Sequence, residues 1–352
     1  MPLYVRARKN FGSFVLDVDF ESPDGVMGLL GASGCGKSMT LKCIAGVVRP
    51  DEGLIISNGR VLFDSSRGIN LPPRSRGVGL LFQNYALFPN MTVEGNIMTV
   101  LGRAARDAGD LYRSLISRFH LSGLEKRYPA DLSGGQQQRT ALARIMAAAP
   151  SLIMLDEPLS ALDSYLRWQL EGELASILEE FGGVALYVSH NRDEVYRMCR
   201  GVCVMNSGRN EPVRTVQDLF DSPDTLASSL LTGCKNYSRI ERVGPRKVRA
   251  LDWNAELECG GTVADDAGFI GVRAHYVHPV SKPGDNVFSC RVERVTHDVF
   301  HTIVNLIPEG TSPEREYSRV RMEITREESS ELRAGDIIEV GIKPRDVMPL
   351  KK

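Results

Sequence analysis

The segment GASGCGKS at 31–38 is the feature that most constrains the fold. It follows the short apolar run GVMGLLG at 25–31, which predicts a buried strand, and it precedes KSMTLKCIAGV at 37–47, which predicts a helix. A glycine-rich turn between a strand and a helix lets successive backbone N–H groups point inward, and the helix N-terminus adds partial positive charge. The pattern and its two flanks therefore predict a loop that binds the phosphates of a nucleoside triphosphate.

The loop residues have distinct expected roles in binding ATP. Lys37 would place a full positive charge on the β- and γ-phosphates, and Ser38 would offer its hydroxyl to Mg²⁺. The backbone that surrounds the phosphates would come from Gly31, Ala32, Ser33, Gly34, Cys35 and Gly36.

A second segment, SLIMLDEP at 151–158, supplies acidic residues to the same site. Four apolar residues predict a buried strand, and Asp156 follows at its C-terminal end, where ligands gather in an open α/β sheet. We expect Asp156 to hold the Mg²⁺ shell and Glu157 to polarise the attacking water.

The order of predicted elements indicates an α/β fold followed by an all-β domain. Residues 3–20 predict two strands joined near 10–12. Further buried strands and helices alternate after them, which predicts a parallel sheet covered on both faces. The strands are expected at 25–31, 79–83, 151–158 and 182–190, and the helices at 110–119, 134–148, 164–181 and 192–199.

After about residue 231 the apolar pattern changes to a period of two with short spacings. This predicts an antiparallel sandwich or small barrel, with 224–235 as the bridge. We therefore expect a nucleotide-binding domain at 1–231 and a C-terminal β domain at 232–352.

The composition excludes some classes of function. The formal net charge is −1, so no global charge favours nucleic acid, and the basic run at 242–249 is interpreted as a solvated surface. The seven cysteines show no paired spacing and are expected to be buried thiols in a reducing cytosol. The N-terminus lacks a signal-peptide pattern, and no apolar run approaches the roughly 18 residues of a membrane span.

A second glycine turn, LSGGQQQR at 132–139, precedes another predicted helix. Ser133 is a good N-cap, and Gly134 and Gly135 are expected to leave the helix N-terminus bare and able to bind an anion. The loop at Lys37 already holds the phosphates of its own subunit. The second turn therefore indicates contact with the nucleotide of another copy, in a head-to-tail dimer.

The motifs GASGCGKS, FQ at 82–83, LSGGQQQR, LDEP, SALD and SH at 189–190, in this order and spacing, resemble the ATP-binding-cassette (ABC) ATPases over about residues 1–230. The resemblance implies a P-loop ABC domain made of a core parallel sheet and a helical subdomain. It implies that Gln83 touches Mg²⁺ and the lytic water, and that His190 contacts the γ-phosphate and holds Glu157.

The resemblance also implies further contacts with ATP. Asp163 matches an acidic residue at the dimer seam, and Phe11 sits where relatives place an aromatic that stacks on adenine, although Phe14 is close and either ring could belong to the core. Met39 follows Ser38 at a position where ABC ATPases usually have threonine. The partner copy would contribute Ser133, Gly134, Gly135 and Gln136.

The segment at 84–97 resembles the part of importer ATPases that receives a helix of the membrane permease. Tyr85 and Phe88 are expected to be exposed there and to line a groove, the alternative being a packed loop. The resemblance thus implies a homodimer on the cytoplasmic side of the cell membrane, peripheral to it. Its partners would be a permease dimer and a periplasmic or lipoprotein oxyanion receptor.

The C-terminal region resembles the ATPases of molybdate importers in several segments, among them LTGCKN at 231–236 and the end of the chain. A Mop-type, oligonucleotide-binding (OB)-like domain is implied at about 286–350, where molybdate or tungstate could act as a regulatory ligand. The run at 283–286 departs from the Mop pattern, and Lys343 could be a ligand or a solvated charge. The alternatives are importers of sulfate or thiosulfate, ferric ion or sugar, a non-transport ABC ATPase, and a tail that only dimerises.

Overall fold

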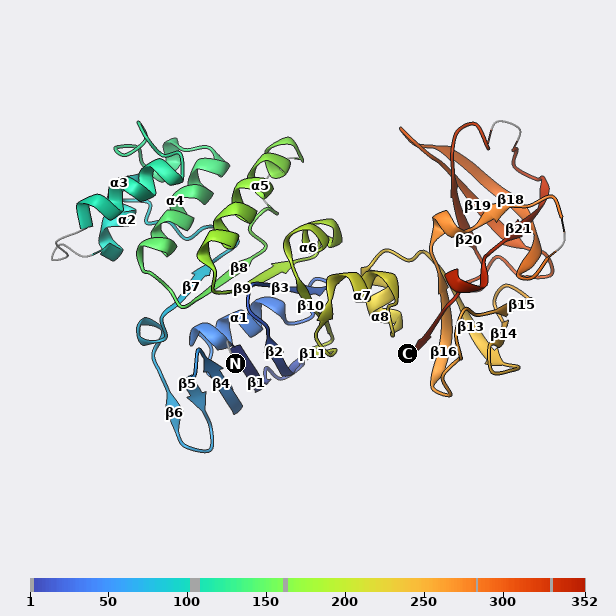
Figure 1. Cartoon of the computed structure of the whole chain (residues 1–352), viewed down its shortest axis with the longest axis horizontal. Helices are drawn as coiled ribbons and strands as arrows, with labels where there is room; N and C mark the ends of the chain where they lie inside the picture. Colours follow the sequence, from blue (N-terminus) through green and yellow to red (C-terminus); the bar gives the residue numbers. More distant parts are fainter. Residues whose placement is uncertain (1–2, 102–107, 161–163, 283, 330–331, 352) are drawn as a thin grey trace. The chain divides into compact units, whose positions relative to one another are not determined.

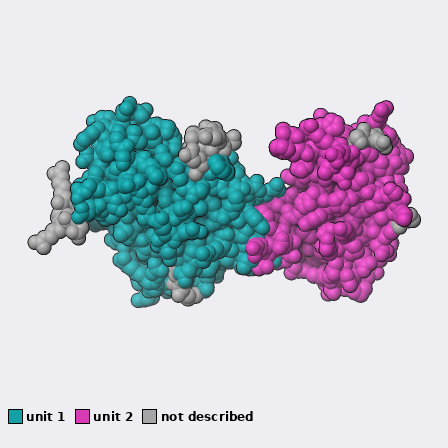
Figure 2. All heavy atoms as spheres, turned by 45° about the horizontal axis from the view of Figure 1, so that its top comes forward, with its two compact units in different colours: residues 1–216 teal, residues 217–352 magenta. Residues whose placement is uncertain are grey.

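The computed structural model describes residues 3–101, 108–160, 164–282, 284–329 and 332–351. The chain divides into two compact units, residues 1–216 and 217–352 (Figure 2). The sequence analysis places the boundary later, at 231/232, which is the end of helix α8 (Leu226–Leu231). Helix α8 itself belongs to the second unit, and its end is tied to the segment that follows, because Ser229 O accepts a hydrogen bond from the N–H of Cys234 at 3.0 Å. The side-chain hydroxyl of Ser229 lies 3.3 Å from the hydroxyl of Tyr237.

Within the described residues, the first unit is built on one mixed sheet of 12 strands. Across the sheet the strands are β6 (Ile69–Asn70), β5 (Arg60–Asp64), β4 (Glu52–Ser57), β1 (Leu3–Asn10), β2 (Val15–Ser22), β11 (Arg209–Asn210), β10 (Gly201–Asn206), β3 (Val26–Gly31), β9 (Val184–Ser189), β8 (Leu152–Asp156) and β7 (Val78–Leu81), with β12 (Arg214–Thr215) pairing β10. Strands β10, β3, β9, β8 and β7 run parallel. The last four were predicted, whereas β10 was not foreseen. The antiparallel β1–β2 pair is also confirmed, but the sequence analysis did not foresee that β4 and β5 extend it.

Helices α1 (Lys37–Ala45), α5 (Ser164–Phe181) and α6 (Arg192–Met198) accompany the parallel strands. Helices α2 (Val93–Leu101), α3 (Ala108–Arg118) and α4 (Gly134–Ala147) form a separate group (Figure 1). Short 3₁₀ helices lie at Pro73–Ser75, Pro129–Asp131, Ala274–Tyr276 and Pro344–Asp346. None of the helices in the described ranges is long and apolar enough to span a membrane.

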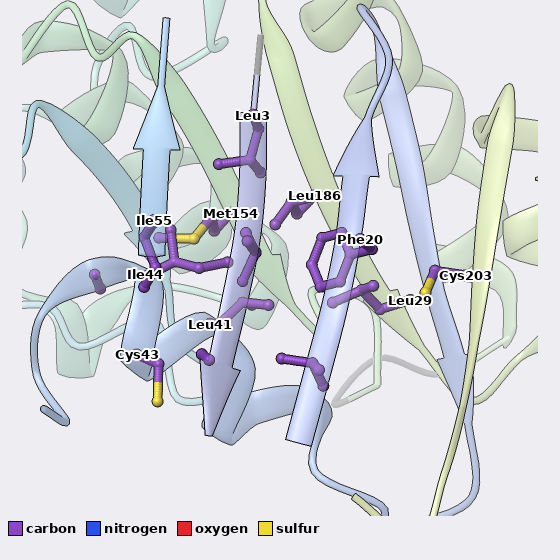
Figure 3. Close-up of a cluster of buried hydrophobic side chains, with 14 of the residues drawn as sticks. Leu3, Phe20, Leu29, Leu41, Cys43, Ile44, Ile55, Met154, Leu186 and Cys203 are labelled. Atoms are coloured by element: carbon purple, nitrogen blue, oxygen red, sulfur yellow. The ribbon is translucent and has the colours of Figure 1, made fainter. Parts of the chain in front are cut away.

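The core of the first unit surrounds α1. Leu41 and Ile44 of this helix are fully buried among side chains from both parts of the sheet, such as Ile55 of β4 and Leu186 of β9 (Figure 3). Full burial of one such side chain is worth about 1.5–3 kcal/mol. The helix that follows the phosphate loop is therefore held rigidly from two sides.

In its described residues the second unit is mainly β, as the sequence predicts. The exceptions are α7 (Val216–Asp221), which begins at the unit boundary, α8 and the 3₁₀ helices at Ala274–Tyr276 and Pro344–Asp346. Its described strands form two five-stranded antiparallel sheets. One sheet holds β15 (Ala255–Glu258), β14 (Lys247–Ala250), β13 (Asn236–Arg242), β16 (Ala267–Val272) and β22 (Met348–Lys351), and the other holds β17 (His278–Pro279), β21 (Ile337–Gly341), β18 (Val287–His297), β19 (Thr302–Pro308) and β20 (Val320–Ile324). The region expected to be Mop-like contributes β18–β21 to one sheet and β22 to the other.

All seven cysteines are buried and free, which confirms their interpretation as small apolar residues. Burial raises the pKa of the Cys43 thiol to about 11, so this thiol stays protonated at neutral pH.

Candidate nucleotide site

A cavity of about 470 Å³ opens at the loop between β3 and α1. It brings together most of the residues that the sequence analysis assigned to ATP, although they come from four separate segments of the chain. Its lining residues are Phe11, Phe14, Ser33, Gly34, Gly36, Lys37, Ser38, Met39, Gln83, Asp156 and Glu157.

The loop backbone adopts conformations that favour glycine. Gly34 has φ +79° and Gly36 has φ +112°, and a Cβ atom at Gly36 would lie 2.9 Å from the side chain of Leu16. Helix α1 starts at Lys37, and no side chain caps its first turn. The N–H groups at this helix end are therefore available to an anion from outside the chain.

Lys37 is buried, with 5% of its surface exposed. Its Nζ donates hydrogen bonds to the carbonyl oxygens of Gly31, at 2.7 Å, and Ala32, at 2.9 Å. In the described part of the chain, no carboxylate oxygen lies within ion-pair distance of this ammonium group. Its third contact is with Cys35 Sγ, at 3.9 Å, so this buried cation is balanced by neutral groups and is well placed to attract a phosphate.

Ser38 and Asp156 meet at the floor of the cavity, where Ser38 Oγ donates to Asp156 Oδ1 at 2.8 Å. Burial raises the pKa of Asp156, and the charge of Glu157 adds to this, while the bond from Ser38 opposes it. A hydroxyl and a desolvated carboxylate form a set of hard oxygen donors, which fits Mg²⁺.

Glu157 follows β8 directly and has an unusual backbone, with φ 48°. Its N–H donates to the carbonyl of Val188 on β9 at 3.0 Å, which fixes this turn between two central strands. His190 follows β9, and its Nδ1 lies 3.2 Å from Glu157 Oε1. The predicted pair is thus in contact at the edge of the cavity, with His190 the more exposed partner.

Gln83 lies just after β7, and its Nε2 donates to Ser160 Oγ at 3.4 Å. Ser160 Oγ in turn donates to the backbone carbonyl of Glu157 at 2.9 Å. The sequence analysis did not assign a role to Ser160. Its position in the SALD motif, three residues after Glu157, is the sequence feature that could have predicted a role for it.

Two aromatic rings border the cavity. The centroids of Phe11 and Phe14 are 6.2 Å apart, with the ring planes inclined by 31°, and Phe11 is 37% exposed. Met39 lines the same cavity. Stacking of adenine on Phe11 stays a prediction.

The second glycine turn is not part of this cavity, because none of residues 133–136 lines it. Ser133 is the N-cap of α4, as predicted, since its Oγ accepts from the N–H of Gln136 at 3.3 Å. The helix end is less bare than the sequence analysis expected, because Gln136 Oε1 also accepts from the N–H of Ser133 at 3.0 Å. Ser133 and Gly134 are exposed, whereas Gly135 is buried, and a Cβ atom there would lie 3.0 Å from Leu170 of α5. Asp163 lies outside the described residues.

The expected exposure of Tyr85 is wrong, whereas Phe88 is 43% exposed, as predicted. Tyr85 is 6% exposed, and burial raises the pKa of its hydroxyl. The backbone takes a left-handed turn at Tyr85, with φ 59°, and Ala86, with φ 45°. A local sequence pattern does not reveal this turn, which accompanies the inward position of the ring.

The C-terminal unit has a second cavity of about 570 Å³. Its charged lining residues are Arg246, Lys247, Glu256, Glu258 and Asp285, a mixed set in which carboxylates outnumber cations. Asn286, in the run that departs from the Mop pattern, is buried and donates to the carbonyl of Glu258 at 2.8 Å. Lys343 is exposed. These contacts do not favour an oxyanion.

Comparison with known proteins agrees with the site. Residues 16–160 match the family model described as ABC transporter. The chain is 38% identical over 287 residues to the sulfate/thiosulfate import ATP-binding protein of Chromobacterium violaceum, an alignment that covers 80% of this chain and 76% of the relative. It is 39% identical over 219 residues to the molybdenum import ATP-binding protein of Paramagnetospirillum magneticum, with 61% and 60% covered.

A dimeric solved structure, the ATP-binding cassette MJ0796 in a post-hydrolysis state bound to ADP and Pi, has a similar fold. The TM-score is 0.51 at 24% identity, over 61% of this chain and 98% of that one. The predicted P-loop ABC fold with a C-terminal all-β domain is confirmed. The family model matches residues 16–160, and the alignment with the Chromobacterium violaceum protein covers 76% of that relative. The chain therefore belongs to the family of ABC transporter ATP-binding proteins.

Proposed function

We propose that this protein is the ATP-hydrolysing subunit of an ABC importer and works as a homodimer on a membrane permease. The observation that carries the proposal is the convergence of Lys37, Ser38, Asp156 and Glu157 on one cavity. These residues supply a phosphate-binding cation, a set of hard oxygen donors and a carboxylate base, which are the parts that phosphoryl transfer to water needs.

Each residue has a role that follows from its contacts. Ser38, Asp156 and Gln83 would hold Mg²⁺, which neutralises charge on the β- and γ-phosphates when bound. Glu157 would accept the proton of the water that attacks the γ-phosphorus as the bond to the β–γ bridging oxygen breaks. His190, 3.2 Å from Glu157, would hold that carboxylate in position.

We infer the dimer from the second glycine turn, whose residues do not line the nucleotide cavity of their own chain. Ser133 and Gly134 are exposed at the start of α4 and face no phosphate site of their own chain. In the proposed dimer, residues 133–136 and Asp163 of each copy contact the ATP bound by the other copy. ATP then closes the dimer and hydrolysis opens it, which drives a permease that works with an external receptor.

The cargo we propose is a tetrahedral oxyanion, molybdate or tungstate. Support comes from the molybdenum import relatives, of which a second, from Rhizobium johnstonii, is 36% identical over 70% of this chain. Sulfate or thiosulfate is the second candidate, because the relative with that printed name aligns along 80% of the chain. Other relatives are named importers of polyamines and of ferric ions. Isothermal calorimetry of the matching receptor with molybdate and with sulfate distinguishes the two candidates. If the receptor binds neither oxyanion, the proposed cargo is wrong.

A Glu157→Gln variant tests the proposed function. Loss of the base should lower hydrolysis by about 10²- to 10³-fold while ATP still binds, so the variant should dimerise in Mg-ATP. Multi-angle light scattering and phosphate release measure the two outcomes, with wild type in Mg-ADP as the control. A variant that stays monomeric at high protein concentration, with its permease present, contradicts the proposal.

A further inference from the structure

We propose that Arg144 is a positioning residue that links helix α4 to the loop at 84–92, so that closure of the dimer on ATP moves this exposed loop. The inference rests on the proposed function and adds the residue that transmits the movement. Arg144 lies on α4, the helix that Ser133 caps, and is half-buried near the C-terminal end of this helix.

The guanidinium group of Arg144 binds the strained part of the loop. Its Nη1 donates to the carbonyl of Ala86 at 2.8 Å, and its Nη2 donates to the carbonyl of Tyr85 at 3.2 Å. These are the two residues with left-handed backbone. Left-handed conformations of residues other than glycine persist only where surrounding contacts hold them, and a planar guanidinium can hold two adjacent carbonyls at once.

The same group also contacts the exposed ring of the loop, because its central carbon lies 5.2 Å from the centroid of Phe88. Burial lowers the pKa of Arg144, which remains charged at neutral pH. Among the described residues, no carboxylate pairs with it. Its charge is therefore balanced by loop carbonyls and an aromatic face, so the loop and α4 are held to each other rather than to an acidic neighbour.

Asn96 of α2 completes the arrangement from the other side of the loop. It is fully buried, accepts from the N–H of Phe88 at 2.9 Å, and donates to the carbonyls of Phe88, Met91 and Thr92 at 3.1–3.2 Å. Its Oδ1 also lies 3.4 Å from Arg144 Nη1. The loop is thus held by two helices that pack on each other (Figure 1).

The loop is connected both to the nucleotide cavity of its own chain and to the helix that we propose contacts the nucleotide of the other copy. Its start follows Gln83, which lines the nucleotide cavity, and its Tyr85–Ala86 turn is bound by Arg144 of α4, the helix that Ser133 caps. A shift of α4 when the start of this helix engages the nucleotide of the other copy would pull on Tyr85 and Ala86 through two hydrogen bonds. The exposed face around Phe88, where a permease helix would dock, would move with them.

Hydrogen exchange of the full chain tests this, with Glu157→Gln as the parent. We expect Mg-ATP to change the exchange rate of amides at 85–92 by at least about fivefold in the parent. In the double variant with Arg144→Met, the loop should exchange about tenfold faster without nucleotide, and its response to Mg-ATP should be lost. Binding of a fluorescent ATP analogue and dimerisation should remain.

Arg113→Met is the matched control, because Arg113 lies on α3 and its ion-pair partner among the described residues is the exposed Asp110, in the same helix turn. Its loop should respond as in the parent. Arg144→Lys, which keeps the charge but cannot bind both carbonyls, should recover only part of the response and serves if Arg144→Met does not fold. In the wild-type background Arg144→Met should leave basal ATPase of the isolated chain within about twofold.

The outcomes separate this inference from the proposed function. A parent that neither binds the analogue nor dimerises overturns the proposed function, and the inference with it. A parent that binds and dimerises, but whose loop either ignores Mg-ATP or responds equally in the Arg144→Met variant, overturns the role of Arg144 alone.

Discussion

Buried polar side chains in the two units have different surroundings and different roles. In the first unit, Lys37 and Asp156 are buried at the wall of a cavity, where the described partners of the ammonium group are all uncharged and burial raises the pKa of the carboxyl. In the second unit, the buried amide of Asn236 exchanges hydrogen bonds with the backbone of Arg321, at 2.8 and 2.6 Å, and joins the two sheets. Burial alone therefore does not mark a site; a buried charge beside open space does.

The largest expected difference between the units concerns two lysines. Lys37→Met should lower ATPase activity by at least about 100-fold, because it removes the charge placed for the phosphates. Lys247→Met removes an exposed ion pair with Glu256 in the second unit and should leave activity unchanged. Steady-state phosphate release compares the variants. Equal losses in both would refute the division of function between the units.

A smaller effect is expected at Asp252, which is fully buried in the second unit. Its Oδ2 accepts from the backbone N–H of Arg239 at 2.8 Å and from its Nε at 3.0 Å. Asp252→Asn should destabilise this unit by about 1–3 kcal/mol, because charge-assisted bonds at a buried site are lost. ATPase activity at low temperature should not change. Urea unfolding followed by the fluorescence of Trp253 measures the loss, and an unchanged midpoint would contradict it.

The contribution of Asp252 should also depend on pH. Burial raises the pKa of Asp252, but the hydrogen bonds and charge of Arg239 lower it by more, so the net shift is downward. A carboxyl with a lowered pKa stabilises the fold fully above its unfolded value of about 3.9, and this stabilisation disappears as the pH falls through the folded value. The difference in stability between wild type and Asp252→Asn should therefore shrink below about pH 3.9. A constant difference down to pH 2 would rule this out.

The smallest effect is expected at the cap of α4. Ser133→Ala removes the acceptor for the N–H of Gln136 and should lower the stability of the first unit by about 1 kcal/mol, whereas Ser133→Gly should lower it by only a few tenths. Thermal unfolding measures both. If the Ala and Gly variants bind ATP but neither dimerises in the Glu157→Gln background, Ser133 acts at the seam as well as in the cap.

The nucleotide site was largely predictable, because its motifs are local. Gly31, Gly36, Lys37 and Ser38 are neighbours in the sequence, so the turn that we propose to bind phosphate follows from residue type and the flanking apolar pattern. The contact of Ser38 with Asp156 required only that helix α1 begins, and strand β8 ends, at the same edge of the parallel sheet. The alternating pattern after residue 231 likewise predicted the all-β unit.

Other features depend on contacts between distant segments. The burial of Tyr85, the bond of Ser160 to Gln83 and the contacts of Arg144 all join segments that the apolar pattern treats separately. The addition of β4 and β5 to the main sheet depends on the pairing of β1 with β4, which no local pattern specifies.

The sequence by itself determined the motifs that we propose to bind phosphate and metal, because that chemistry lies in short runs of fixed spacing. Only the tertiary structure decided which polar groups face a cavity, which are satisfied by backbone, and which helix holds the loop at 84–92. The physical reason is that side-chain partners are set by packing between elements far apart in the chain, and packing energy depends on the whole core rather than on any one segment.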